Sequence, residues 1–261
     1  MLPVVDKPLI QYAVEEALYA GIEEIIFVTG PGKSALEDHF DRSLELEKIL
    51  FNKGKSELLD SITNILPDNV RVIYTRQGEP LGLGHAIYCA HSIIGNEPFA
   101  VLLADDIFLG TSPCLKQMVD AYNSVGGNLI AAMNVAKEDV SKYGILGFSD
   151  DNGKLVTINK LVEKPSPKDA PSTLAISGRY ILQPEIFEYL AHEKIGVGGE
   201  IQLTDSIEKL LKNHKVFGYL FEGERFDCGD KFGWLRANLT FALESDTLNP
   251  KIKALMADLL N

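Results

Sequence analysis

The first 140 residues alternate between segments that match a buried strand and segments that match an amphipathic helix. The first helical segment begins at Asp6, which can cap it, and keeps one apolar face until Gly21 ends it. Strands are predicted at 24–30, 70–74, 99–103 and 129–134, and further helices at 84–93 and 113–122. Strands that alternate with helices are typical of a doubly wound α/β sheet.

The pattern changes after residue 140. Two strand-like runs, 145–148 and 155–161, flank Asp150-Asp151-Asn152-Gly153, which is a strong hairpin signal. Further strands are predicted at 174–182 and 215–221, and helices from Pro184 and at 202–213, 231–243 and 250–260. We therefore expect one domain over residues 1–261, with a mostly parallel first half (1–140) and an antiparallel, mixed second half (141–261).

Residues 35–66 interrupt the alternation with a charged, helix-forming stretch that contains no strand signal. We interpret this stretch as a helical insertion. A solvated helical hairpin accounts for the pattern, and a cover over a site or a contact between subunits would account for it too.

Composition narrows the class of ligand. The chain has 261 residues, and its 46% hydrophobic and 24% charged residues are ordinary for a globular protein that builds a sizeable core. Lys plus Arg number 25 and Asp plus Glu number 37, so the formal net charge is 25 − 37 = −12. Such a field repels polyanions, so we expect no nucleic-acid or anionic-membrane partner, whereas a small phosphorylated ligand needs only a local cationic cluster.

Localisation signals point to the cytoplasm. No apolar run approaches the length of a membrane span, and the amino end lacks the basic and apolar regions of a signal peptide. The three cysteines, Cys89, Cys114 and Cys228, lie far apart without a CxxC pair. A disulfide framework or a zinc site is therefore not expected.

Two glycine-containing loops follow predicted strands. Gly30-Pro31-Gly32-Lys33-Ser34 fails as a P-loop because the position five residues before Gly32 is Phe27, not glycine. The loop at 76–86 (RQGEPLGLGHA) lies between a strand and a helix, where backbone amides can approach a negative ligand. Gln77 offers the donor and the acceptor that a nucleobase edge requires. A tight turn in which His85 is a packed helix residue explains the spacing equally well.

Acidic residues follow two predicted strands. Asp105 and Asp106 come directly after the strand at 99–103, and ligands of open α/β sheets bind beyond the carboxyl ends of strands. We favour Asp105 as a Mg²⁺ ligand beside phosphates and Asp106 in a structural or supporting role, although both acids could merely cap the next segment. Asp227, in a turn after the strand at 215–221, is a candidate second metal ligand.

The segment at 160–165 (KLVEKP) ends a strand with an adjacent acid and base. Glu163 could accept hydrogen bonds from sugar hydroxyls and Lys164 could contact a phosphate, while spacing alone fits a surface ion pair equally well.

Taken together and in this order, several segments resemble the bacterial UTP–glucose-1-phosphate uridylyltransferases. They span essentially the whole chain and are MLPVVDKPLIQYAVEEA, GKSALEDHFD, RQGEPLGLGHA, FAVLLADD, SKYGILG, LVEKP, ISGRYIL, GEIQLTD and RFDCGDKFG. The resemblance implies a Rossmann-like nucleotidyltransferase fold with a mostly parallel central sheet and an antiparallel sugar-binding part. It also implies a cytoplasmic homo-oligomer that makes UDP-glucose from UTP and glucose 1-phosphate with Mg²⁺.

The resemblance also implies roles at the nucleotide and the metal. Gln77 and Gly82 match the residues that recognise uracil, by side chain and by backbone respectively. Asp105 matches the Mg²⁺ ligand, and Asp227 takes the place of a second metal-binding acid in related pyrophosphorylases.

Further matches line the sugar phosphate. Gly144, Glu163 and Gly178 match positions of the glucose pocket, and Lys164 matches the lysine that holds the sugar phosphate. By this resemblance Asp105 and Lys164 carry the catalysis.

The sequence departs from the family at two places. Pro31 stands where the family usually carries arginine, and little effect on the chemistry is expected. The family also opens with an apolar strand, a GxGTR loop that cradles the triphosphate and a Pro-Lys-Glu, all before the segment that begins here at Met1. A misplaced start codon or a real truncation would account for this.

Two alternatives to a normal uridylyltransferase follow from these departures and from the acidic motif. The chain could be a weakly active or inactive sugar-nucleotide-binding remnant with exposed strand edges. A metal-dependent glycosyltransferase, whose acidic motif Asp105-Asp106 resembles, is disfavoured by LVEKP and GLGHA.

Overall fold

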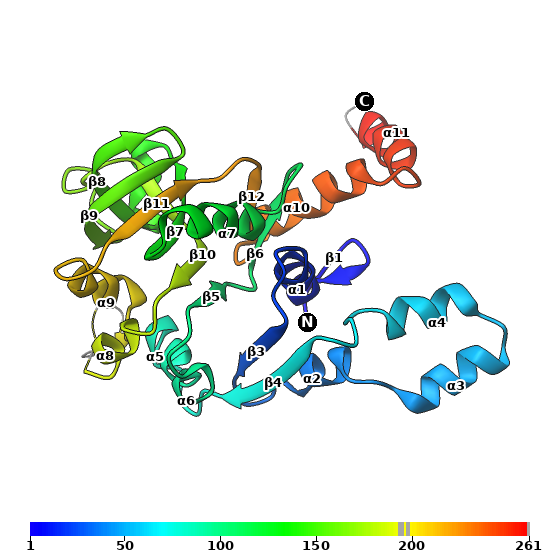
Figure 1. Cartoon of the computed structure of the whole chain (residues 1–261). Coiled ribbons are helices and arrows are strands. Elements are labelled where there is room, and N and C mark those ends of the chain that lie inside the picture. Colours follow the sequence, from blue (N-terminus) through cyan, green and yellow to red (C-terminus); the bar gives the residue numbers. More distant parts are fainter. Residues whose placement is uncertain (193–195, 197–198, 260–261) are drawn as a thin grey trace.

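A computed structural model describes residues 1–192, 196 and 199–259, and a six-stranded sheet forms its largest part (Figure 1). The strands in spatial order are β5 (Phe99–Leu102), β10 (Leu174–Leu182), β7 (Asn128–Asn134), β11 (Val216–Leu220), β9 (Leu155–Glu163) and β8 (Gly144–Asn152). Strands β8 and β9 form the hairpin that the turn signal predicts. Strands from both halves of the chain thus share one sheet.

Parallel pairing occurs in two places among the described strands. β7 pairs with β11 in parallel, and β3 (Glu24–Thr29) pairs with β4 (Arg71–Arg76) in a separate parallel ladder. β10 runs antiparallel to β5 and β7, and β9 runs antiparallel to β11 and β8, so the prediction of a mostly parallel central sheet is wrong. The hydrophobic pattern identifies strands but not their neighbours, which explains the difference.

Strand β7 shows why the apolar runs become central strands. Leu129 and Ala131 face the cluster that includes α7 (Cys114–Val125), while Ile130 and Ala132 face the cluster on the other side. Because alternate side chains of a strand point to opposite faces, a continuous apolar run buries both faces. Helix α1 (Leu9–Tyr19) joins α7 on the first face. Residues of the second-face cluster come from α5 (Leu83–Tyr88), α6 (His91–Ile94), α8 (Ile186–Leu190) and α9 (Leu203–Leu210).

The predicted cap of the first helix is wrong. Helix α1 begins at Leu9, and its N-cap is Pro8, which has an extended backbone and no capping side chain. Asp6 instead lies in the turn of a small hairpin formed by β1 (Pro3–Val4) and β2 (Lys7–Pro8). Gly21 does adopt the expected left-handed backbone after the helix, with φ of 89°.

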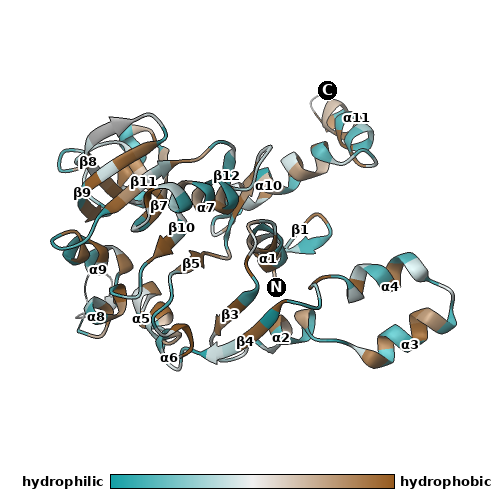
Figure 2. Cartoon of the chain, in the orientation of Figure 1, coloured by the Kyte–Doolittle hydropathy of each residue, from teal (hydrophilic) through white to brown (hydrophobic). Residues whose placement is uncertain are grey.

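Residues 35–66 are helical and contain no strand, as predicted. Helices α2 (Ser34–Phe40), α3 (Leu44–Asn52) and α4 (Ser56–Thr63) follow one another, and the hairpin of α3 and α4 projects away from the sheet (Figure 1). Neither α3 nor α4 buries any residue, although both carry apolar side chains (Figure 2).

A β-ribbon and two helices complete the fold. In the ribbon, β12 (Glu224–Asp227) of the carboxyl-terminal part pairs with β6 (Asp106–Leu109) of the first half. A 3₁₀ helix, η1 (Lys137–Lys142), precedes β8. Helix α10 (Lys231–Glu244) is capped by Asp230, which accepts from the N–H groups of Phe232 and Gly233. Helix α11 (Asn249–Leu259) follows, and the predicted last position, Leu260, lies outside the described residues. None of the described helices has the length and hydropathy to cross a bilayer.

Candidate active site

The ribbon of β6 and β12 brings the acidic segments together. Asp106 pairs with Asp227 and Phe108 pairs with Arg225 across the two antiparallel strands. The prediction that Asp227 lies in a turn is therefore wrong. Each strand has only four residues, which is too short for a clear alternation to be recognised. The ribbon does show the two-residue periodicity of a strand. Phe226 and Ile107 are both buried in one apolar cluster, while Arg225 and Asp227 share the opposite face of β12.

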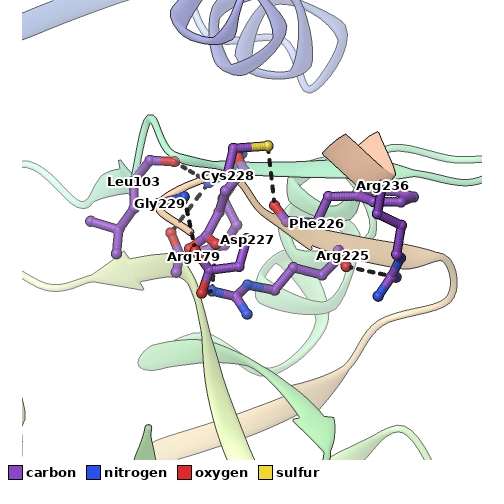
Figure 3. Close-up of polar contacts among 10 residues, drawn as sticks. Leu103, Arg179, Arg225, Phe226, Asp227, Cys228, Gly229 and Arg236 are labelled. Atoms are coloured by element: carbon purple, nitrogen blue, oxygen red, sulfur yellow. Dashed lines mark hydrogen bonds and ion pairs between the residues drawn. The ribbon is translucent and has the colours of Figure 1, made fainter. Parts of the chain in front are cut away.

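Asp105 and Asp227 both lie close to Gly229, and Figure 3 shows Asp227 beside Gly229. The N–H of Gly229 donates to Asp227 Oδ1 at 3.0 Å, and the N–H of Cys228 donates to the carbonyl oxygen of Asp105 at 2.8 Å. A Cβ atom on Gly229 would lie 3.1 Å from Asp227 Oδ1 and 3.2 Å from Asp105 Oδ2. The carboxylates of Asp105 and Asp227 thus both lie next to the space that the missing side chain of Gly229 leaves open.

This pair of carboxylates suits an ion such as Mg²⁺, which takes few protein ligands, better than a metal ion whose ligands all come from the protein. Among the described residues, no cluster of three or more His, Cys, Asp or Glu side chains could enclose a metal. Mg²⁺ is commonly held by one or two carboxylates and completes its shell with waters and phosphates. Asp105 is exposed and Asp227 is partly exposed, so a ligand can reach both.

Asp106 has a different environment from Asp105. It is 2% exposed and its Oδ1 forms an ion pair with Arg225 Nη2 at 2.5 Å. Burial raises the pKa of Asp106 to about 7, although the Arg225 charge acts in the opposite direction. The same Arg225 nitrogen lies 3.2 Å from Asp227 Oδ2. Arg225 therefore contacts both carboxylates, and its ion pair with the buried Asp106 helps to hold Asp227 in position.

Gly178 packs against Asp106. Its φ is 75°, and a Cβ atom there would lie 1.9 Å from Asp106 Oδ2. Only glycine fits this position without displacing the carboxylate. The sequence predicted Gly178 as a sugar-pocket residue, and the structure places it where β10 passes the buried end of the ribbon.

Gly144, Glu163 and Gly178 line one cavity of about 160 Å³, together with Arg225 and Thr204. Gly144 pairs with Glu163 in the β8–β9 ladder. Thr204 Oγ donates to Glu163 Oε2 at 2.6 Å and orients that carboxylate. The structure thus brings the three predicted sugar-pocket residues together.

Lys164 adopts a left-handed backbone with φ of 46° directly after β9 ends. This conformation breaks the alternation of the strand, so Lys164 Nζ lies 3.6 Å from Glu163 Oε1 instead of on the opposite face. The ammonium group remains about half exposed while Glu163 is largely covered. Lys164 itself is not among the residues that line the cavity, and the cationic side chains that the described residues contribute to its wall are those of Lys142 and Arg225, for which the sequence predicts no role.

Gln77 and Gly82 meet at the carboxyl end of the parallel β3–β4 pair. The N–H of Gln77 donates to the carbonyl oxygen of Thr29 at 2.8 Å, and Gln77 Nε2 donates to the carbonyl oxygen of Gly82 at 3.0 Å. Gly82 has φ of 97°, and a Cβ atom there would lie 2.7 Å from Glu200 Cβ.

This loop is held by the segment before α9. The N–H of Ile201 donates to the carbonyl oxygen of Leu81 at 2.7 Å, and the N–H of Gly84 donates back to Ile201 at 2.9 Å. Leu83 and Gln202, from these two segments, belong to the wall of the 160 Å³ cavity. The Gln77–Gly82 loop therefore adjoins the cavity.

Comparison with known proteins first defines the class. The sequence matches the nucleotidyl transferase family over residues 1–242. This agrees with the α/β sheet and with the acidic pair beyond its strands, so the chain is a nucleotidyltransferase.

Individual relatives narrow this class. The chain is 48% identical over 261 residues to the UTP–glucose-1-phosphate uridylyltransferase of Bacillus subtilis, covering 100% of this chain and 89% of that protein. A UTP-bound UDP-glucose pyrophosphorylase from Acinetobacter baumannii is 41% identical with a TM-score of 0.92, covering 99% of this chain and 90% of the other. A UDP-glucose pyrophosphorylase complexed with UDP-glucose is 44% identical with a TM-score of 0.86, covering 94% and 90%. The chain belongs to the UTP–glucose-1-phosphate uridylyltransferase family, and the predicted family and nucleotidyltransferase fold are confirmed.

Proposed function

We propose that this protein transfers the uridylyl group of UTP to glucose 1-phosphate, giving UDP-glucose and pyrophosphate. The observation that carries the proposal is the adjacency of three groups of residues. The groups are the Asp105–Asp227 pair, the cavity that Glu163 lines and the Gln77–Gly82 loop. The cavity connects the other two groups, because its wall includes Arg225, which contacts Asp227, and Leu83, which follows Gly82 in the chain. Each group suits one part of the substrates.

The sugar and the base would occupy the two ends of this site. Glu163 Oε2 accepts from Thr204, while Oε1, which lies 3.6 Å from Lys164 Nζ, would also accept from a sugar hydroxyl. Gly144 and Gly178 line the cavity without side chains, and their missing Cβ atoms leave room for the carboxylates of Glu163 and Asp106 respectively. Uracil would lie against Gln77 and Gly82.

The reaction needs positioning and charge neutralisation more than a general base. A phosphate oxygen of glucose 1-phosphate attacks the α-phosphorus of UTP, and the bond from that phosphorus to the bridging oxygen breaks to release pyrophosphate. The nucleophile is already anionic at neutral pH, so no proton has to be removed from it. Lys164 would orient this phosphate and offset its charge.

Asp105 and Asp227 would hold a Mg²⁺ ion. When bound, such an ion neutralises the developing charge on phosphate oxygens. Arg225 keeps Asp227 in place through the 3.2 Å contact, and its contact with Asp106 keeps Arg225 in place.

Localisation and assembly are part of the same proposal. We place the enzyme in the cytoplasm, and the three free thiols of Cys89, Cys114 and Cys228 support a reducing compartment. We also propose a homo-oligomer, supported by the apolar side chains that α3 and α4 expose.

Substitution of the acidic pair tests the mechanism. Asp105→Asn keeps the size of the side chain and removes its charge, and we expect the rate of UDP-glucose formation to fall on the order of a hundredfold or more. Asp227→Asn should cause a smaller loss and a higher Mg²⁺ requirement. The assay measures UDP-glucose by chromatography at several Mg²⁺ concentrations.

Asp120→Asn is the matched control, because Asp120 only pairs with Lys116 on the exposed face of α7. Its rate should equal that of the unsubstituted protein. Full activity of Asp105→Asn would exclude Asp105 as a metal ligand. Binding of UDP-glucose without any turnover would favour the sugar-nucleotide-binding alternative.

A further inference from the structure

The side-chain amide of Gln77 is held by two acceptors. Its Nε2 lies 3.0 Å from the carbonyl oxygen of Gly82 and 3.0 Å from Nδ1 of His85. A carbonyl oxygen only accepts hydrogen bonds, so the amide atom that faces Gly82 must be the nitrogen. Both protons of that nitrogen are then directed inward, one to each acceptor.

This arrangement determines the tautomer of His85. Nδ1 has to accept from Gln77, so a neutral imidazole carries its proton on Nε2. Nε2 lies 3.9 Å from Cys89 Sγ, a weak acceptor four residues further along the same helical face. Helix α5 thus presents the imidazole to Gln77 in a defined orientation.

Two polar groups remain available to a ligand. The carbonyl oxygen of Gly82 already accepts from Gln77 and, at 3.1 Å, from the N–H of Ala86. Within the described part of the chain, no group accepts from the N–H of Gly82 or donates to Gln77 Oε1. The loop therefore offers one donor, Gly82 N–H, and one acceptor, Gln77 Oε1.

When N3 of the base faces Gln77 Oε1 and a base carbonyl faces Gly82 N–H, such a donor–acceptor pair distinguishes pyrimidines. Uracil and thymine present an N3–H donor next to carbonyl oxygens, whereas N3 of cytosine is an acceptor. Cytosine would place its N3 lone pair against Gln77 Oε1 unless the amide turned over. Turning the amide over would break the hydrogen bonds to Gly82 and to His85.

We infer that His85 is a positioning residue that holds the amide oxygen of Gln77 toward the base and so selects pyrimidines that carry an N3–H. The inference rests on the proposed uridine-nucleotide site and adds to it the residue that sets the base preference. His85 itself contacts no substrate in this account.

The test compares the affinities of UDP and CDP by isothermal titration calorimetry. The unsubstituted protein should prefer UDP. His85→Leu removes the acceptor, so the ratio of the CDP Kd to the UDP Kd should fall about fivefold, the factor that corresponds to one neutral hydrogen bond. His85→Asn can keep an acceptor near the Nδ1 position and should restore most of the ratio. If His85 had a merely structural role, His85→Leu would weaken the binding of UDP and CDP equally and leave the ratio of their Kd values unchanged.

His91→Leu is the matched control, because His91 stacks on Tyr88 and Phe187 and has no contact with Gln77. It should leave the ratio unaltered. If the unsubstituted protein binds no UDP, the proposed function fails and the inference fails with it. If UDP binds and His85→Leu keeps the full ratio, only the inference is overturned.

A second measurement does not depend on the folding of a variant. Nitrogen-15 NMR of the histidine rings at a pH where His85 is neutral should show its proton on Nε2. A proton on Nδ1 would overturn the inference, because Nδ1 could then not accept from Gln77.

Discussion

At the scale of single residues, Lys164 has a strained backbone conformation and is also the residue that we propose to orient the phosphate of glucose 1-phosphate. Its φ of 46° is a left-handed conformation that side-chain-bearing residues rarely adopt. The N–H of Lys164 donates to the carbonyl oxygen of Tyr143 at 3.0 Å, which helps to hold this conformation. Strain of this kind is frequent at functional sites, where the surrounding structure maintains it.

Glycine at this position separates the backbone strain from the ammonium group. Lys164→Gly should be more stable than Lys164→Ala by about 1 kcal/mol, because glycine avoids the steric cost of the left-handed backbone. Both variants should lose most UDP-glucose synthesis, since both lack the ammonium group. Urea unfolding measures the free energies.

Equal free energies of unfolding for the glycine and alanine variants would show that the backbone of Lys164 is not strained. Normal synthesis by either variant would exclude Lys164 from the phosphate site.

At this same scale, several residues of the candidate site could be predicted from the sequence, but the residues that hold them in position could not. Gln77, Asp105 and Glu163 were identifiable because each lies in a motif next to a strand end. Arg225 was not, because its partner Asp106 is 119 positions away in the sequence. A long-range ion pair leaves no local pattern in a single sequence.

At the scale of elements, one buried ion pair joins α1, α7 and β10. Arg179 of β10 is fully buried, and its Nη2 lies 2.9 Å from Glu16 Oε2 of α1. The other Glu16 oxygen accepts from the N–H of Leu115 at the start of α7. Arg179 also donates to the carbonyl oxygens of Leu103 and Asp106 and so fixes the turn that carries Asp105.

Removal of the Arg179 guanidinium should destabilise the fold. Arg179→Met leaves Glu16 buried without its cation, and we expect the free energy of unfolding to fall by about 3–5 kcal/mol. Replacing Glu16 with Met in the same protein should recover part of that loss, because no unpaired charge is left. Urea unfolding followed by circular dichroism gives these values.

The exposed pair of Arg42 with Glu47 on the insertion serves as the control. Arg42→Met should change the free energy of unfolding by less than about 1 kcal/mol. If Arg179→Met were as stable as Arg42→Met, the buried pair would not be what joins these elements.

The apolar content of a strand decided how well the sequence predicted it, since β5, with four apolar residues, was predicted although it is as short as β6 and β12. Strand β10 was predicted with its observed bounds because apolar residues mark both of its ends, 174–176 and 180–182, although polar residues and a glycine separate them. The four-residue strands β6 and β12 were missed, since their pairing depends on each other and not on either segment alone. The part of the fold nearest the Asp105–Asp227 pair was therefore the hardest to predict.

At the scale of the whole molecule, apolar side chains gather on the projecting hairpin of α3 and α4. Leu44, Phe51 and Leu58 are all more than half exposed. Exposed apolar patches of this kind commonly mark interaction surfaces. The sequence left a solvated hairpin, a cover over a site and a subunit contact open for this insertion, and its exposed apolar side chains favour the subunit contact.

We expect the protein to self-associate through this hairpin. Light scattering should give a mass that is a multiple of 28.7 kDa, and the double variant Phe51→Glu/Leu58→Glu should shift it toward a single chain. Tyr19→Glu is the control, because Tyr19 is exposed on α1, away from the hairpin. A mass of one chain at every concentration would contradict the proposed assembly.

The central claim is that the Asp105–Asp227 pair and the adjoining cavity join UTP to glucose 1-phosphate. Phosphorus-31 NMR of the protein with both substrates and Mg²⁺ tests it most directly, because each phosphate product has its own resonances. We expect UDP-glucose and pyrophosphate in equal amounts, with no inorganic phosphate. Release of inorganic phosphate from UTP, or unchanged UTP and glucose 1-phosphate, would contradict it.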